Sequence, residues 1–223
     1  MTLKEALDAL KIAFANFETA ARSDDKTPLQ NALALNEAKE AFATTAESPR
    51  IVIFADINRL KAINTEYGYA AGDATISQVG LLIQEHFVEK IEGQAFRPSG
   101  DEFVILLQNQ FLDEFKLLVP LFADCEVPLD DKRFSIGVSF GFAFSSEEIE
   151  FEIIKSRAEI ACKKAKIKGA GICLEWAEEM EQTALENMRD TCSKCGTINV
   201  CDVPMVMSLR RLKVCAACGI GFG

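Results

Sequence analysis

The chain has 223 residues, of which 49% are apolar and 26% charged, and its formal net charge is −10 at pH 7. This length and balance are typical of a chain that folds into one medium domain and a small one, and they argue against disorder. The negative charge argues against a protein that coats nucleic acid, because neutralising phosphates needs a surplus of Lys and Arg. A small anionic ligand held by a few local cations and a metal ion is not excluded.

The N-terminal residues alternate charged and apolar side chains, unlike a signal peptide. The longest uncharged stretch, residues 134–146, is too short to cross a bilayer. We therefore expect a cytoplasmic protein with no membrane partner. In a reducing cytosol, the eight cysteines favour metal binding over disulfides.

Apolar spacing predicts helices and strands that alternate along the chain, and hence an α/β fold with a central sheet flanked by helices. In chain order we expect a helix over 2–22, a helix from Pro28 to about Thr45, a buried strand over 51–55, a helix over 71–88, a hairpin of strands 94–97 and 103–107, a helix over 111–123, a strand or hairpin arm over 134–144, a helix over 148–168 and a strand over 172–176. The expected segments are an N-terminal helix (1–22), a main domain (23–177), a linker (178–189) and a small metal-binding domain (190–223).

Three acidic residues lie where strands are expected to end. Asp56 follows the buried strand 51–55, and Asp101 and Glu102 lie in the turn of the hairpin. If the hairpin lies beside the first strand, Asp56 and Asp101 converge, and such a pair suits Mg²⁺, which takes one or two carboxylates plus substrate phosphates. The residues alone leave an alternative open, in which Asp56 caps the next helix and the turn acids are solvated.

Several motifs, in the right order from residue 24 to residue 176, resemble those of the GGDEF family of diguanylate cyclases. Residues 53–64 and 67–73 resemble the stretch written DxDxFKxxND…GHxxGD, and residues 97–103 resemble the signature turn. Residues 24–31 resemble the N-terminal motif DxLTGLxNR. Residues 138–141 and 158–169 resemble the SIG strand and the ADxALYxAKxxG helix. The resemblance implies a nucleotidyl-cyclase-like sheet flanked by helices.

The same resemblance implies an enzyme that joins two GTP molecules into cyclic di-GMP, with two domains meeting face to face as a homodimer. Mg²⁺ or Mn²⁺ would be bound by Asp56, Asp101 and the carbonyl of Ile57. Glu102 would be a further metal ligand or the base for the 3′-hydroxyl. The attack on the α-phosphate would be a metal-assisted phosphoryl transfer.

Substrate-binding roles also follow from the resemblance. Asn64 and Asp73 would read guanine, and a carboxylate at position 73 suits the N1–H and N2–H₂ donors of that base. The remaining residues implied near the substrate are Lys61 and Lys166 at the phosphates, Ser99 and Gly100 through their backbone, and Leu60 beside the base.

The sequence departs from the family pattern at several positions that bear on the expected site. Lys26 stands where Leu is usual, Asn58 replaces Asp, Leu60 replaces Phe, Tyr69 replaces His, Ser99 replaces Gly and Ala170 replaces Arg. The last change removes a bidentate phosphate clamp, which Lys168 or Arg97 could offset. The product-inhibition motif RxxD is absent from residues 90–93, so no feedback inhibition is expected there. A catalytically inactive domain that senses GTP or a dinucleotide, or an interaction module, remains an alternative.

The C-terminal segment predicts a structural zinc site. Two C-x-x-C-G motifs, each with thiolates that can point at one ion, provide the four ligands Cys192, Cys195, Cys215 and Cys218. A segment this short should need the metal to fold. This zinc ribbon could dock on a protein partner or on a second copy, whereas its few basic residues are a weak basis for binding nucleic acid.

Overall fold

The computed structural model describes residues 2–44, 50–129, 132–145 and 149–180, together with four two-residue strands nearer the C-terminus. Those strands form two antiparallel pairs. The first pair is β8 (Asp190–Thr191) with β9 (Ile198–Asn199), and the second is β10 (Lys213–Val214) with β11 (Gly221–Phe222).

The main domain contains a five-stranded sheet in the order β2-β3-β1-β6-β7. Its strands are β1 (Arg50–Ile57), β2 (Gln94–Ser99), β3 (Glu102–Gln108), β6 (Val138–Phe144) and β7 (Cys173–Glu175). Neighbouring strands are antiparallel except β6 and β7, which are parallel. The central strand β1 is buried on both faces, as its continuous apolar run predicts, and its side chains alternate between two hydrophobic clusters.

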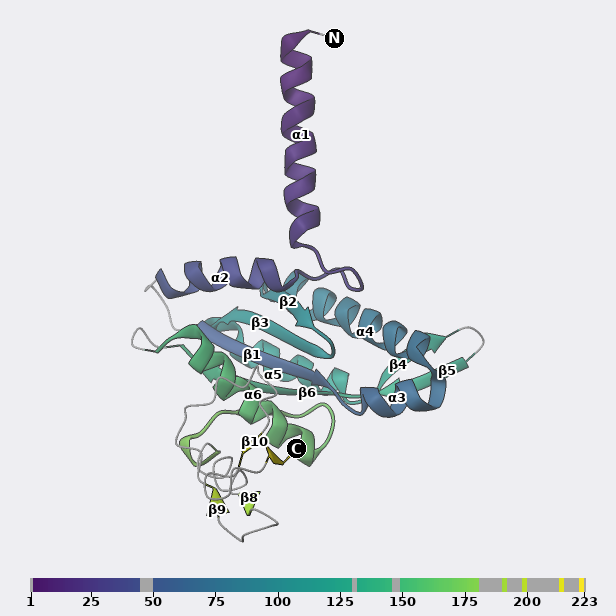
Figure 1. Cartoon of the computed structure of the whole chain (residues 1–223), viewed down its shortest axis with the longest axis vertical. Coiled ribbons are helices and arrows are strands. Elements are labelled where there is room, and N and C mark those ends of the chain that lie inside the picture. Colours follow the sequence, from purple (N-terminus) through teal and green to yellow (C-terminus); the bar gives the residue numbers. More distant parts are fainter. Residues whose placement is uncertain are drawn as a thin grey trace.

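Helices cover both faces of this sheet (Figure 1). One face carries α2 (Ala32–Thr44) and α6 (Phe151–Lys168), and the other carries α3 (Leu60–Tyr67), α4 (Tyr69–Ile83) and α5 (Leu112–Leu118). A π-helical segment, Gln84–Glu89, continues α4, and two 3₁₀ segments, Asn109–Phe111 and Val119–Phe122, flank α5. Gly141 allows α6 to lie directly on β6, since a Cβ there would be 2.1 Å from the backbone nitrogen of Cys162.

Two expected boundaries are wrong. The second helix begins at Ala32 and not at Pro28, because the Asn31 side chain accepts hydrogen bonds from the backbone N–H groups of residues 33 and 34 and thereby caps it. Residues 134–144 do not form one strand, because β5 (Lys132–Ile136) pairs with β4 (Cys125–Leu129) while β6 joins the main sheet. The break falls at Gly137, whose carbonyl accepts the N–H of Asn58.

Helix α1 (Leu3–Arg22) projects away from the rest of the molecule and buries none of its residues (Figure 1). Thr2 and Glu5 begin it with a capping box, in which each side chain accepts a hydrogen bond from the other's backbone N–H. Among the described residues, no helix combines the length and apolar composition needed to cross a membrane.

A buried ion pair fixes the loop of residues 23–31 between α1 and α2. Arg97 donates from Nη1 to both carboxylate oxygens of Asp24, at 2.9 and 3.0 Å, and from Nε to the carbonyl of Gly100 at 2.9 Å. The two charged side chains are only 7% and 8% exposed. Arg97 therefore ties the loop to the signature turn. Because it is engaged there, it is not free to take the place of the arginine that the resemblance implies at position 170.

We expect Asp24→Ala to lower the free energy of unfolding at pH 7 by about 3 kcal/mol, because Arg97 stays buried without its partner. Burial raises the pKa of Asp24, but hydrogen bonds from Thr27 and Arg97 outweigh it, so this pKa lies below its ordinary value. The contribution of Asp24 is therefore present above the unfolded pKa of about 4 and is lost as the pH falls through the lower folded pKa. Urea denaturation of wild type and Asp24→Ala at several pH values measures this contribution to the free energy of unfolding.

The stability difference between wild type and Asp24→Ala should be constant from pH 7 to about pH 5 and shrink below about pH 4. Asp25→Ala is the matched control, because that carboxylate is 82% exposed and lies 3.8 Å from Arg97. A difference that widens in acid, or an equal loss in the control, would contradict this assignment.

Candidate functional site

Strand pairing brings the three acidic residues together. Asp56 at the end of β1 lies opposite Glu102 at the start of β3, and the N–H of Ile57 donates to the carbonyl of Asp101 at 3.3 Å. Asp101 follows Gly100 in the tight turn between β2 and β3, where Gly100 has a φ of 56°. The predicted approach of the hairpin to the first strand is confirmed. The alternative role for Asp56 as a helix cap is wrong, because the next helix begins at Leu60 with Arg59 at its N-cap.

The local electrostatics of this cluster favour the approach of a cation. Burial is the main cause that raises the pKa of Asp56, and the charge of Asp101 adds to it, while the ammonium of Lys166 opposes it. Burial also raises the pKa of Glu102, reinforced by the negative charges of Glu159, Asp101 and Asp56. Half-buried carboxylates that repel one another are stabilised by a positive ion placed between them.

Lys166, in the last turn of α6, supplies such a positive charge. Its Nζ donates to Oδ1 of Asp56 and, at 3.2 Å, to the carbonyl oxygen of Ile57. The resemblance implied phosphate contacts for Lys166, and the structure instead places it on two of the three expected metal ligands. Two oxygen donors of the expected set thus converge on one cation, and hard oxygen donors are what Mg²⁺ prefers.

The donor set also limits what metal site is feasible. Among the side chains that the structure describes, no group of three or more His, Cys, Asp or Glu residues is arranged to hold a metal ion. Asp56, Asp101 and the Ile57 carbonyl therefore fit a Mg²⁺ ion only if substrate phosphates complete its coordination, which is the usual arrangement for that ion.

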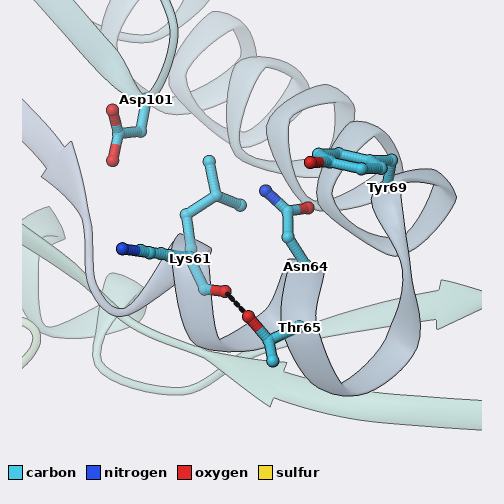
Figure 2. Close-up of a pocket in the computed structure, with 6 residues that line it drawn as sticks. Lys61, Asn64, Thr65, Tyr69 and Asp101 are labelled. Atoms are coloured by element: carbon cyan, nitrogen blue, oxygen red, sulfur yellow. Dashed lines mark hydrogen bonds between the residues drawn. The ribbon is translucent and has the colours of Figure 1, made fainter.

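A cavity of about 440 Å³ lies beside Asp101, one member of the acidic cluster (Figure 2). Its lining comes from α3, the start of α4 and the signature turn, through Leu60, Lys61, Asn64, Thr65, Tyr69 and Asp101. The buried Oδ1 of Asn64 has no hydrogen-bond partner, so this amide has unused capacity in its folded position. The cavity brings together four residues that the sequence assigned to one site.

Helix α3, which carries three of those four residues, was not predicted. The apolar pair Leu60 and Ile63, both buried, has the i, i+3 spacing that could have indicated it. Arg59 has a φ of 62°, and this left-handed residue lets the chain turn sharply from β1 into the helix. Thr65, which also lines the cavity, was not assigned from the sequence.

Asp73 lies near the cavity, but it is not among the residues that line it. Its Oδ1 is 2.5 Å from Nζ of Lys26. A Cβ at the preceding Gly72 would be 1.9 Å from Oδ1 of Asn64, so the Asn64 side chain lies directly against α4 beside Asp73. The two residues expected to read the base thus lie on adjacent helices, with the carboxylate already paired to a lysine.

The remaining positions of the expected site differ in their surroundings. Ser99 ends β2 and pairs with Glu102, while a Cβ at Gly100 would meet no atom within 4 Å. Ala170 packs so closely on Gly137 that a Cβ at Gly137 would be 2.1 Å from its own. The four cysteines expected to bind zinc lie outside the described residues.

Comparisons with known proteins show which family this chain belongs to. The family profile described as diguanylate cyclase, GGDEF domain, matches residues 21–171. Diguanylate cyclase DgcS of Shewanella oneidensis is 27% identical over 141 residues, which are 63% of this chain and 45% of that protein. Cyclic di-GMP phosphodiesterase PdeR of Escherichia coli is 27% identical over 179 residues, 74% of this chain and 26% of that protein. The chain thus spans less than half the length of these curated relatives.

Solved structures share the fold. The coiled coil and GGDEF domain of DgcB from Caulobacter crescentus, in complex with c-di-GMP, aligns with a TM-score of 0.68 at 19% identity, covering 77% of this chain and 94% of that one. The GGDEF domain of FimX from Pseudomonas aeruginosa aligns with a TM-score of 0.61 at 20% identity, covering 69% and 98%. Since the family profile covers more than half of the chain, the protein belongs to the GGDEF domain family.

Proposed function

We propose that this chain is a diguanylate cyclase that condenses two GTP molecules into cyclic di-GMP. The observation that carries the proposal is the convergence of Asp56, the Ile57 carbonyl and Asp101 beside a cavity lined by Lys61 and Asn64. Carboxylates that can hold a divalent cation, next to a cation and an amide in a cavity, suit a nucleoside triphosphate. We place the reaction in the cytoplasm, where reduced cysteines would persist.

Each residue of the proposed site would have its own role in phosphoryl transfer. Mg²⁺ or Mn²⁺, held by Asp56, Asp101 and the Ile57 carbonyl, would neutralise the charge that develops on the phosphates. Asn64 would orient the base, and Lys61 would meet the phosphates. Lys166, once a metal ion takes over its two oxygen partners, would be available for the phosphate contacts that the resemblance implies. Glu102 would be a further metal ligand or the base that accepts the 3′-hydroxyl proton, and the pKa that burial raises suits it to hold that proton.

One observation favours a second candidate, a domain that binds GTP without turning it over. Ala170 replaces the arginine of the family pattern and packs against Gly137, and Arg97 is engaged with Asp24. A site that lacks the bidentate clamp would position the α-phosphate less well. The experiment below separates the two candidates.

Purified protein incubated with GTP and Mg²⁺ should form cyclic di-GMP, identified by mass spectrometry. Asp101→Ala should lower turnover about 100-fold or more, because loss of a metal ligand removes several kcal/mol of transition-state stabilisation. Asp113→Ala, on the exposed surface of α5, is the control and should retain full activity. GTP binding without product would favour the sensor, and unchanged turnover in a folded Asp101→Ala variant would remove the metal assignment.

Catalysis by this family pattern needs two domains face to face, and α1 offers a way to join them. Its side chains Leu3, Leu7, Leu10, Phe14 and Phe17 repeat at spacings of four and three, the a and d pattern of a coiled coil. All five are at least half exposed, and Leu3 is 89% exposed. A second copy of α1 would bury this stripe. We therefore propose a homodimer joined through α1.

Leu10→Glu should weaken the dimer about tenfold or more, because it places a charge within the apolar seam of the coiled coil. Ile12→Glu is the matched control, since Ile12 is 63% exposed against 66% for Leu10 and lies on the opposite side of the helix from the seam. Analytical ultracentrifugation over a concentration series measures both. Equal dissociation in the two variants, or a monomeric wild type, would contradict dimerisation through α1.

The backbone around the two cysteine motifs supports the proposal of a structural zinc ion. Residues 192–197 connect the paired strands β8 and β9, and residues 215–220 connect β10 and β11. Each six-residue connection has cysteines at its first and fourth positions. Four thiolates would fill a tetrahedral shell and leave no position for substrate, so the ribbon would support folding and docking, on a partner protein or a second copy.

Metal analysis of the intact chain should find about one zinc ion per molecule, and Cys195→Ser should reduce this content severely. Cys201→Ser is the control, because Cys201 lies outside both motifs, and it should keep its zinc. A wild-type chain purified without chelators that contains no zinc, or an equal loss in the control, would show that the ribbon is not organised by these motifs.

A further inference from the structure

A lysine pairs with the carboxylate that is expected to read the base. Lys26 lies in the loop of residues 23–31, at a motif position where the family pattern has Leu. Its ammonium is 2.5 Å from Oδ1 of Asp73, a residue 47 positions further along the chain. The Lys26 side chain is 37% exposed and that of Asp73 is 56% exposed, so a ligand can reach both.

The fold holds Lys26 in this place. Its backbone N–H donates to Oδ2 of Asp24, the carboxylate that Arg97 fixes from the other side. The next residue, Thr27, packs on α4, because a Cβ at Gly80 would be 2.5 Å from the Thr27 side chain. The loop is therefore anchored on the helix that carries Asp73, and the Lys26–Asp73 contact does not depend on a mobile segment.

The paired charges lie beside the proposed nucleotide cavity. Asn64 lines that cavity (Figure 2). Its amide lies directly against Gly72, which precedes Asp73 in α4. A base that contacts Asn64 from the cavity would therefore lie next to α4, the helix that carries Asp73 with its paired Lys26. Both charged groups retain capacity after pairing, since an ammonium has three donors and a carboxylate has about four lone-pair sites.

Guanine matches this pair of groups. Its Watson–Crick edge presents the acceptor O6 next to the donors N1–H and N2–H₂. A carboxylate can take both donors, but it would leave O6 without a partner. An adjacent ammonium supplies the missing donor, which an apolar side chain at position 26 cannot do. Adenine has an amino group at the position of O6, so the ammonium would there face another donor.

We propose that Lys26 is a specificity-determining residue that donates to O6 of guanine while Asp73 accepts from N1–H and N2–H₂. This inference rests on the proposed binding of GTP. In a competing role, Lys26 would prevent Asp73 from binding the nucleotide. Removing Lys26 would then raise the affinity for GTP, whereas our proposal expects that affinity to fall. Exposed ion pairs are weak, so a nucleotide could displace Lys26 from Asp73 at little cost. A Lys26 that contacts both Asp73 and the base would instead add a charge-assisted hydrogen bond to the nucleotide.

The test compares Lys26→Met, which keeps the length of the side chain and removes its donors, with wild type. Binding is measured by calorimetry with Ca²⁺ replacing Mg²⁺ to slow turnover. The dissociation constant for GTP should rise about five- to tenfold in the variant. For 6-thioguanosine triphosphate, which keeps N1–H and N2–H₂ but carries a poorer acceptor in place of O6, it should rise less than about twofold.

Lys39→Met is the matched control, because Lys39 forms a comparable ion pair with Glu152, at 2.7 Å and with exposures of 30% and 51%. GTP affinity in this control should equal that of wild type. The inference would be overturned if Lys26→Met bound GTP as tightly as wild type or the Lys39→Met control, or more tightly. It would also be overturned if the variant lost affinity for GTP and for 6-thioguanosine triphosphate by the same factor. A wild-type protein that does not bind GTP would instead overturn the proposed function itself.

Discussion

Antiparallel pairing between β1 and β3 places Asp56 opposite Glu102 and directs the N–H of Ile57 to the carbonyl of Asp101. This register is strongly constrained, because β1 is buried on both faces and a slip of one residue would exchange its two sets of apolar side chains. The acidic cluster therefore follows from the packing of the core. The apolar core residues of β1 and β3 thereby set the geometry of the proposed metal site.

Ion pairs surround the acidic cluster. Lys166 neutralises Asp56 from α6, Arg97 ties the signature turn to Asp24, and Lys26 occupies Asp73. Asp56, Asp24 and Asp73 thus each have a cation as neighbour. The buried Asp24–Arg97 pair has a structural role, whereas the two lysines pair with groups that a nucleotide and its metal ion would also use.

Much of the fold could be predicted from local patterns, including the buried strand β1, the hairpin with its acidic turn and the long helix that ends at Gly169. The features that could not be predicted depend on contacts between residues that lie far apart in the sequence. The Lys26–Asp73 and Lys166–Asp56 pairs join residues 47 and 110 positions apart, so their formation requires knowledge of the packed fold. The start of α2 was misplaced because the Asn31 cap overrides the preference of Pro28 for a first helical turn.

The central claim, that Asp56, Asp101 and the Ile57 carbonyl hold a divalent cation together with GTP, is tested most directly by calorimetry with the non-cleavable analogue guanosine 5′-[α,β-methylene]triphosphate. Wild-type protein should bind this analogue about tenfold or more tightly in Mg²⁺ than in EDTA, because the metal joins the phosphates to the carboxylates. Asp56→Asn should remove most of that difference. Equal affinity of the wild type in Mg²⁺ and in EDTA, or an undiminished Mg²⁺ effect in the variant, would contradict the account.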